Sequence, residues 1–301
     1  MDKGVGVLCC LDEAYPQALL QDQDCPIILY YYGRTALLNQ VSCAIVGSRR
    51  ATAYGKKMAE EFASAFASAG LCVVSGMAKG IDAAAHEGAL SVQGATIAVL
   101  GSGPDVPYPN ENRKLYGRIR EEGLILSEFY PGEKPLSWHF PLRNRIISGL
   151  SRFVLLAEAE ARSGALITCD WAAEQGKDVW ALPGPISNPY SIGPLRLIKE
   201  GAMMAISPMD ILQQYTKEEQ ELDQQALALS GEQSLDLLSQ EERALYQQIS
   251  YYPVHINSLL ANYSSSNGKM SKKEGDIYLD LTKLASLRLI EKLPGDYYQR
   301  V

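Results

Sequence analysis

Short apolar runs alternate with longer amphipathic stretches between residues 43 and 206, and this alternation limits the fold of the chain more than any other feature. The runs expected to form strands are Cys43–Val46, Leu71–Val74, Thr96–Leu100, Leu124–Leu126, Phe153–Ala157, Val179–Leu182 and Met203–Ile206. The stretches expected to form helices are Gly55–Ala69, Ile81–Gln93, Asn110–Glu122, Ile146–Leu150, Ala165–Gln175 and Pro194–Glu200. Strands that alternate with helices predict a doubly wound, mostly parallel α/β sheet with helices on both faces.

Two segments flank this predicted domain, which we place at residues 43–215. Residues 1–42, which contain Tyr15-Pro16 and Cys25-Pro26, are expected to form a short helical or irregular lead-in. Residues 216–239 are expected to be an acidic, solvated linker, because residues 216–242 hold one Lys or Arg against eight Asp or Glu. The net charge of −7 is therefore concentrated in the connector, and it does not exclude a basic pocket elsewhere.

Residues 240–301 follow a different pattern. Three helices are expected at Gln240–Ile249, His255–Ala261 and Ile277–Leu287, followed by a hairpin over residues 288–300 that turns at Pro294-Gly295. Three helices and a terminal hairpin predict a small C-terminal winged-helix domain. The polar segment Ser264–Glu274, with its three lysines, is expected to be a loop. Binding to DNA and a protein-contact or packing role both remain open for this domain.

Composition narrows the class of protein further. The six cysteines show neither C-x-x-C spacing nor spaced histidines, so reduced thiols are expected and a structural zinc site is not. The sequence contains no run of about 18 apolar residues, and its first residues resemble neither a signal peptide nor a lipidation motif. A cytoplasmic protein with no membrane segment and no metal is therefore expected.

The loop after the first predicted strand of the sheet carries two arginines. It reads Gly47-Ser48-Arg49-Arg50, and Tyr54-Gly55 opens the next helix. A dinucleotide-binding fold has G-x-G-x-x-G at this place, so NAD binding is disfavoured. Gly47 permits close backbone approach, the Ser48 hydroxyl can donate to an oxygen, and the Arg49 guanidinium can bind a phosphate with two donors. The alternative is a tight turn with exposed arginines.

The loop after the second predicted strand of the sheet contains Gly76 and Gly80, which can bring the backbone close to a ligand. Asp82 follows at a helix start, where it is expected to act as a cap or a first-turn charge. His86 lies four residues further on and is expected to bond locally to Asp82. An acid–base pair is the less favoured alternative, because no nucleophile accompanies these two residues.

Residues 138–168 contain the strongest anion-binding signal. Arg143-Asn144-Arg145 stand where a loop pattern turns into an apolar helix, and Ser163-Gly164 open another helix. Guanidinium groups beside helix N-termini form an anion site, because their donors and the backbone amides point at the same oxygens. No acid–base pair is evident in this stretch, which therefore favours phosphate binding.

These motifs together resemble the DprA/Smf family of DNA-processing proteins over about residues 15–212. Besides those above, the motifs are Ser75-Gly76 with Ala78, Gly101 and Gly103 with Asp105, Tyr108-Pro109 with Asn112, Ser127-Glu128, Phe140-Pro141, Leu166-Ile167-Thr168, Pro183-Gly184 and Gly201-Ala202. The resemblance implies an extended Rossmann-like domain that binds single-stranded DNA and forms a homodimer. It also implies loading of the RecA recombinase onto incoming strands during natural transformation, against the single-strand-binding protein, with no catalysis, cofactor or metal.

Mapped by motif, the resemblance assigns a phosphate pocket to this chain. The residues are Gly47, Ser48, Arg49, Phe140, Arg143, Asn144 and Arg145, with Lys79, Ser163 and Gly164 as neighbours. The Phe140 ring is expected to stack on a base, and the alternative is a core position. Two features depart from the family pattern. Leu195 stands where an asparagine is usual, and the N-terminal region is too short for the extra domain of many relatives.

Two other functions remain as alternatives. The first is a nucleotide-processing enzyme of the lysine-decarboxylase-like, cytokinin-activating type, which has a similar sheet and phosphate loops. Its Pro-Gly-Gly-x-Gly-Thr-x-x-Glu run is absent, since Pro183-Gly184-Pro185 does not match it. The second is a scaffold that binds no DNA and recruits proteins through the winged helix.

Overall fold

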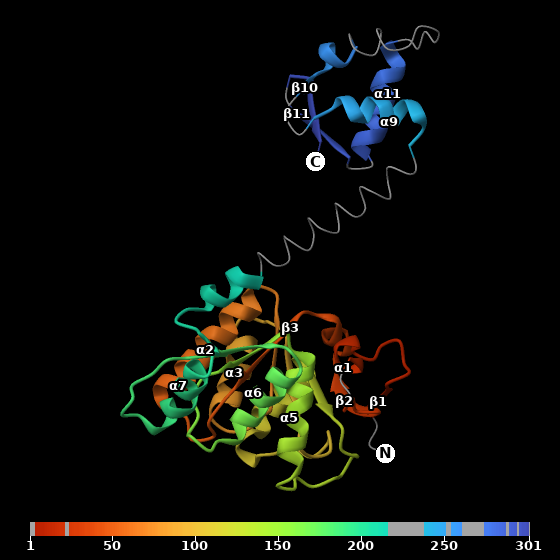
Figure 1. Ribbon diagram of the computed structural model, residues 1–301. Helices are drawn as coiled ribbons and strands as arrows, with labels where there is room; N and C mark the ends of the chain where they lie inside the picture. The colour runs from red at the N-terminus through yellow and green to blue at the C-terminus, as the bar shows by residue number, and fades with distance from the viewer. Residues whose placement is uncertain are drawn as a thin grey trace. The chain divides into compact units, whose positions relative to one another are not determined.

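The computed structural model describes residues 4–21, 24–215, 238–250, 254–260, 274–286, 289–293 and 295–300 (Figure 1). The chain divides into two compact units, Met1–Gln214 and Tyr215–Val301. The residues that we assigned to an anion site all lie in the first unit.

A nine-stranded sheet forms the centre of the first unit, with the order β1-β2-β6-β5-β4-β3-β7-β8-β9. The strands are β1 (Gly6–Cys9), β2 (Ile28–Gly33), β3 (Ser42–Val46), β4 (Cys72–Ser75), β5 (Thr96–Val99), β6 (Leu124–Ser127), β7 (Phe153–Leu156), β8 (Asp178–Ala181) and β9 (Met203–Met204). All neighbours from β6 to β9 pair in parallel. The predicted α/β fold with a mostly parallel sheet is confirmed.

Helices cover both faces of this sheet (Figure 1). They are α1 (Gln17–Leu20), α2 (Ala53–Ser68), α3 (Ile81–Ser91), α4 (Arg113–Glu122), α5 (His139–Leu150), α6 (Gly164–Glu174) and α7 (Ile192–Lys199). Short 3-10 helices lie at Thr35–Asn39, Asn110–Asn112 and Pro189–Ser191, and residues 208–215 are helical. Among the described residues, no helix combines the length and the apolar character that crossing a bilayer requires.

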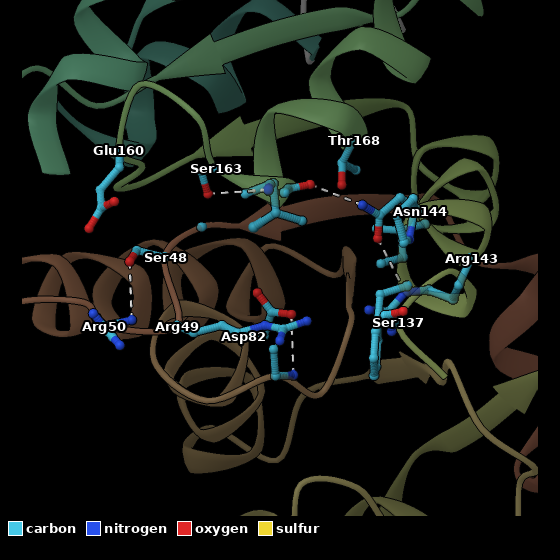
Figure 2. A pocket seen from close by; sticks show the side chains of 18 of the residues that line it. Ser48, Arg49, Arg50, Asp82, Ser137, Arg143, Asn144, Glu160, Ser163 and Thr168 are labelled. Carbon is cyan, nitrogen blue, oxygen red and sulfur yellow. Dashed lines mark hydrogen bonds between the residues drawn. The ribbon is translucent and has the colours of Figure 1, made fainter. Parts of the chain in front are cut away.

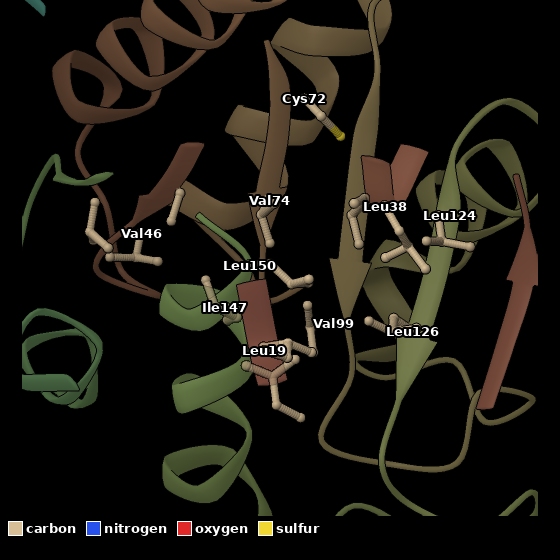
Figure 3. Packing of buried hydrophobic residues seen from close by; sticks show 14 of the residues in the cluster. Leu19, Leu38, Val46, Cys72, Val74, Val99, Leu124, Leu126, Ile147 and Leu150 are labelled. Atoms are coloured by element: carbon tan, nitrogen blue, oxygen red, sulfur yellow. The ribbon is translucent and has the colours of Figure 1, made fainter. Parts of the chain in front are cut away.

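The core follows from the alternation of side chains along the strands. Val46, Val74 and Val99 point to the face covered by α5, where they meet Ile147 and Leu150 (Figure 3). On the opposite face, side chains of β5 and β6 pack with α3 and α4 in a second cluster. Both faces of the parallel strands are thus buried, which explains why these strands are continuous apolar runs in the sequence.

The described part of residues 1–42, namely 4–21 and 24–42, differs from the helical or irregular lead-in expected from the sequence. β1 pairs antiparallel with β2, and β2 pairs antiparallel with β6, so this segment extends the main sheet. Leu19 and Leu29 are buried in the cluster that also contains Leu124 and Leu126. The segment is therefore part of the first unit's core.

The second unit contains α9 (Gln240–Gln248), a helical stretch at 256–260, α11 (Glu274–Ser286) and a three-stranded antiparallel sheet. Its strands are β10 (Val254–His255), β11 (Ile290–Leu293) and β12 (Tyr297–Arg300), in the order β10-β12-β11. Ser239 caps α9 in a capping box with Glu242. Residues 216–237 of the expected linker and most of the expected loop at 264–274 lie outside the described residues. Winged-helix membership stays a prediction.

Candidate nucleic-acid interface

The strand order of the sheet reverses between β3 and β7. From β3 the chain builds β4, β5 and β6 on one side, and then returns to place β7, β8 and β9 on the other. In open α/β sheets the ligand site lies outside the carboxyl ends of the strands at such a reversal. A cleft of about 680 Å³ lies at this point, between the loop after β3 and the segment after β7.

Eight of the ten residues predicted for the site line this cleft. They are Gly47, Ser48, Arg49, Phe140, Arg143, Asn144, Ser163 and Gly164. Figure 2 shows Glu160 and Ser163 on one wall, and Ser48 and Arg50 on the other. The two walls belong to segments far apart in the sequence, which the reversal of the sheet brings together.

The loop Gly47–Thr52, here called the arginine loop, forms one wall. The Ser48 amide donates to the Glu158 carbonyl over 2.6 Å, and the Ser48 hydroxyl accepts a bond of 3.1 Å from the Arg50 amide. A Cβ at Gly47 would lie 2.8 Å from the Glu158 carbonyl oxygen, so only glycine fits this approach. Arg49 and Arg50 are exposed at the tip of a loop whose backbone is fixed.

The loop between β4 and α3 packs against the arginine loop and hydrogen-bonds to it. Gly80 has a φ of +82°, and a Cβ there would lie 2.2 Å from the Ser48 carbonyl oxygen. The Ile81 amide donates to the same oxygen over 3.2 Å. Gly80 is therefore required both by its left-handed backbone and by the contact between the two loops.

An aromatic face lies beside the arginine loop. The Arg49 guanidinium carbon lies 4.9 Å from the centre of the Phe140 ring. The centres of the Tyr108 and Phe140 rings are 5.6 Å apart. Phe140 is half-buried because one side of its ring packs over Gly101. The Phe140 ring is thus neither a core side chain nor a free one. Tyr108, which is 42% exposed, was assigned no role from the sequence.

Arg143 is buried, with 4% of its surface exposed, although it lines the cleft. Its Nη1 donates to the Gly76 carbonyl over 2.8 Å and also to the Val99 carbonyl, at the ends of β4 and β5. Burial lowers the pKa of the Arg143 guanidinium to about 10, with Asp82 opposing this effect. Arg143 thus ties α5 to the sheet and also gives the cleft floor a positive charge.

Asp82 and His86 do not form the local bond expected from their spacing. The Asp82 carboxylate accepts from the Ala78 amide over 3.3 Å, whereas the His86 Nδ1 lies 2.7 Å from the Thr96 hydroxyl. Burial raises the pKa of Asp82, while the Arg143 charge opposes this rise. Burial and, to a lesser extent, Arg143 lower the pKa of His86 to about 3, so the imidazole is neutral. His86 is a core histidine.

Arg145 and Lys79 lie outside the cleft to which the sequence assigned them. Arg145 donates from Nη2 to the Glu128 carboxylate over 2.7 Å and lines a separate surface groove. Lys79 pairs with Glu111 and lines a smaller cavity of about 60 Å³ that also touches Phe140. Arg145 therefore lies outside the candidate site, whereas Lys79 lies beside it.

The N-terminus of α6 forms part of the opposite wall. The Ser163 hydroxyl accepts from the Ala165 amide over 3.3 Å, and the Asn144 amide group donates to the Gly164 carbonyl over 3.2 Å. Asn144 therefore links α5 to the first turn of α6. Leu195 lies in α7 and does not line the cleft, so the departure from the family pattern at this position leaves the cleft unchanged.

One buried carboxylate was missed entirely from the sequence. Glu158, with 2% of its surface exposed, accepts from the Thr52 amide over 2.8 Å and from the Thr52 hydroxyl over 2.6 Å. Thr52 is the N-cap of α2, so Glu158 binds the start of this helix. The only sequence signal was a glutamate within the alternating Ala-Glu stretch that follows β7.

A doubly wound, mostly parallel sheet with a cleft at its switch point, lined by arginines and an aromatic ring, defines a protein of the Rossmann-like α/β class. The family model for DNA recombination-mediator protein A matches residues 6–216. The chain belongs to this family, the DprA/Smf proteins, and the predicted family is confirmed. The family is one of recombination mediators, which are binding proteins rather than enzymes.

Individual relatives agree with this assignment. The DNA processing protein DprA of Streptococcus pneumoniae is 48% identical over 205 residues, which cover 68% of this chain and 72% of that protein. An X-ray structure of the Streptococcus pneumoniae protein matches with a TM-score of 0.68 at 47% identity, over 70% of this chain and 74% of that one. A structure of the Helicobacter pylori protein, described for its single-stranded DNA binding mode, matches with a TM-score of 0.65 at 31% identity. It covers 71% of this chain and 96% of that chain.

Proposed function

We propose that this chain binds single-stranded DNA in the switch-point cleft. The observation that carries the proposal is the position of Arg49, exposed on a rigid loop and lying 4.9 Å from the half-buried Phe140 ring. A guanidinium can bind a backbone phosphate while an adjacent ring stacks on a base. This combination of groups fits a polynucleotide better than a lone anion.

A single strand fits this cleft better than a duplex. The exposed Tyr108 ring, and the Phe140 ring once Arg49 turns from it to a phosphate, can stack only on bases that are free of their partners, and every base offers such a face regardless of sequence. The Helicobacter pylori relative, whose structure concerns single-stranded DNA binding, supports the same choice for this chain. Binding is therefore expected to be nearly independent of sequence and sensitive to salt.

The mediator role of the family supports a further step. We propose that the bound strand is protected and passed to the RecA recombinase in the cytoplasm, displacing the single-strand-binding protein during natural transformation. A homodimer is also proposed. β9 is an edge strand of the described sheet; its residue Met204 is 52% exposed, and Ile206 and Met209, which follow it, are 71% and 54% exposed. An exposed apolar edge of this kind is a surface for pairing with another chain.

The direct test is fluorescence anisotropy of a labelled oligonucleotide with Arg49→Ala. We expect affinity to fall about tenfold or more, because a charge-assisted hydrogen bond contributes about 1.5–3 kcal/mol. Arg118→Ala is the matched control. It removes the same charge from α4, where Arg118 pairs with Glu87 over 2.6 Å and does not line the cleft.

Equal affinities of the two variants would contradict the cleft assignment. Release of a free base from a nucleoside monophosphate would instead support the nucleotide-processing alternative, which the family membership disfavours. A wild-type protein that binds no oligonucleotide at all would support the scaffold alternative.

A further inference from the structure

The N-terminus of α2 binds a carboxylate of the protein itself, that of Glu158. The two carboxylate oxygens of Glu158 accept from the amide and the hydroxyl of Thr52, over 2.8 Å and 2.6 Å. The Thr52 hydroxyl oxygen in turn accepts from the Gly55 amide over 3.1 Å. A negative charge is stabilised at this end of a helix, where the helix dipole is positive and backbone amides lack partners within the helix.

α2 lies where a related class of folds binds a ligand. α2 follows β3, the strand at which the order of the sheet reverses. In dinucleotide-binding folds the helix in this place receives the pyrophosphate at its N-terminus. Here the Glu158 carboxylate is bound to Thr52, the N-cap of α2, so an anion that approached this helix end would meet both its bulk and its charge.

Gly55 shows how closely the carboxylate is seated. A Cβ at Gly55 would lie 2.3 Å from the Glu158 carboxyl carbon and from one of its oxygens. Glycine within a helix is unfavourable relative to alanine by about 0.5–1 kcal/mol, so its use in the first turn of α2 needs a reason. The close approach of Glu158 supplies that reason. In a dinucleotide fold, the corresponding glycines make room for a ligand or a strand.

We infer that Glu158 determines the specificity of the cleft by closing the N-terminus of α2 to the phosphates of free nucleotides. Phosphates that enter the cleft must then bind the exposed Arg49 and Arg50 side chains, which suits the backbone of a polymer. This role in specificity rests on the proposed binding of single-stranded DNA, whereas the closing of the helix end does not. Glu158 also fixes Ser48 and Thr52, the two ends of the segment that carries both arginines.

The test compares Glu158→Gln and Glu158→Ala with wild type, using inorganic pyrophosphate as the probe in isothermal titration calorimetry. The glutamine keeps the shape and a hydrogen bond to Thr52 but removes the charge, and the alanine also opens the space. We expect the affinity for pyrophosphate to rise about tenfold or more in folded Glu158→Ala, and by less in Glu158→Gln, which keeps the bulk. Glu160→Ala is the matched control, because Glu160 is an exposed carboxylate that lines the same cleft.

A gain in Glu158→Ala that Glu160→Ala lacks would support the inference, and a gain in Glu158→Gln as well would show that the charge contributes besides the bulk. If Glu158→Ala does not fold, Glu158→Ser replaces it, because serine also opens the space. An equal gain in the smaller Glu158 variant and in Glu160→Ala would show a general charge effect and overturn the inference, as would no gain in a folded variant that opens the space. Oligonucleotide binding by wild type is measured in parallel. Its absence together with a pyrophosphate gain would refute the proposed function and leave the closing role of Glu158 standing.

Discussion

Arg49 and Arg143 line the same cleft, but the protein uses their side chains differently. Arg49 is exposed and lies over the Phe140 ring, so its guanidinium is available to a phosphate. Arg143 is buried and donates to the carbonyls of Gly76 and Val99. Loss of Arg49 should therefore affect binding, whereas loss of Arg143 should first affect the fold.

Arg143→Met is expected to lower the free energy of unfolding by about 2–4 kcal/mol, because buried carbonyls lose their donor and the buried Asp82 loses the nearby positive charge. Urea denaturation of the variant and wild type measures this loss. Arg49→Ala serves as the control, since an exposed substitution should change stability by about 0.5 kcal/mol or less. An Arg143→Met protein as stable as Arg49→Ala, with DNA binding abolished, would instead make Arg143 a direct ligand contact.

Of the residues predicted from the sequence to share one site, Arg49 and Phe140 both line the cleft, whereas Arg145 lies in a separate groove. Residues two positions apart on a helix point about 200° away from each other. Arg143 and Arg145 therefore cannot face one cleft once both lie inside a helix, and Arg145 pairs with Glu128 instead. Glu158 was missed because its partner, Thr52, is more than one hundred residues away. No local pattern reveals such a contact.

At the scale of elements, the helix that carries these arginines begins earlier than expected. α5 starts at His139, although the sequence favoured a start near Ile146. Pro141 explains the error, because proline usually interrupts a helix but is accepted in the first turn, where its missing amide has no partner to lose. The antiparallel strands β1 and β2 were missed for another reason. β2 is held in the sheet by its pairing with β6, about ninety residues later in the chain, and no local pattern reveals such a pairing.

The contact between two loops gives a prediction at this scale. Gly80→Ala should weaken oligonucleotide binding and lower stability, because the new Cβ would clash with the Ser48 carbonyl and the residue has a φ of +82°. Thermal unfolding and anisotropy measure the two effects. Gly117→Ala in α4 is the control, since a Cβ there meets nothing within 4 Å and alanine favours a helix. Equal behaviour of the two variants would mean that the loops do not support each other.

At the scale of the whole molecule, the net negative charge gives no indication of the arginine-lined cleft. The chain has a net charge of −7, yet the cleft is lined by Arg49, Arg50 and Arg143 against Asp82 and Glu160. The sequence allowed this separation to be predicted, because the excess of acidic over basic residues is concentrated in residues 216–242. The alternation of strands and helices likewise predicted the sheet. The cleft could not be predicted in this way, because its two walls are far apart in the sequence and meet only through the strand order of the folded sheet.

The central claim is that backbone phosphates bind in this cleft. The most direct measurement is the affinity for a labelled single strand across a salt series, with a duplex of the same length and Arg49→Ala in parallel. We expect log K to fall linearly with log salt, with a slope that becomes shallower by about 0.7 in Arg49→Ala when one phosphate contact is lost, and weaker binding of the duplex. A slope unchanged in Arg49→Ala, or equal affinity for duplex and single strand, would contradict the account.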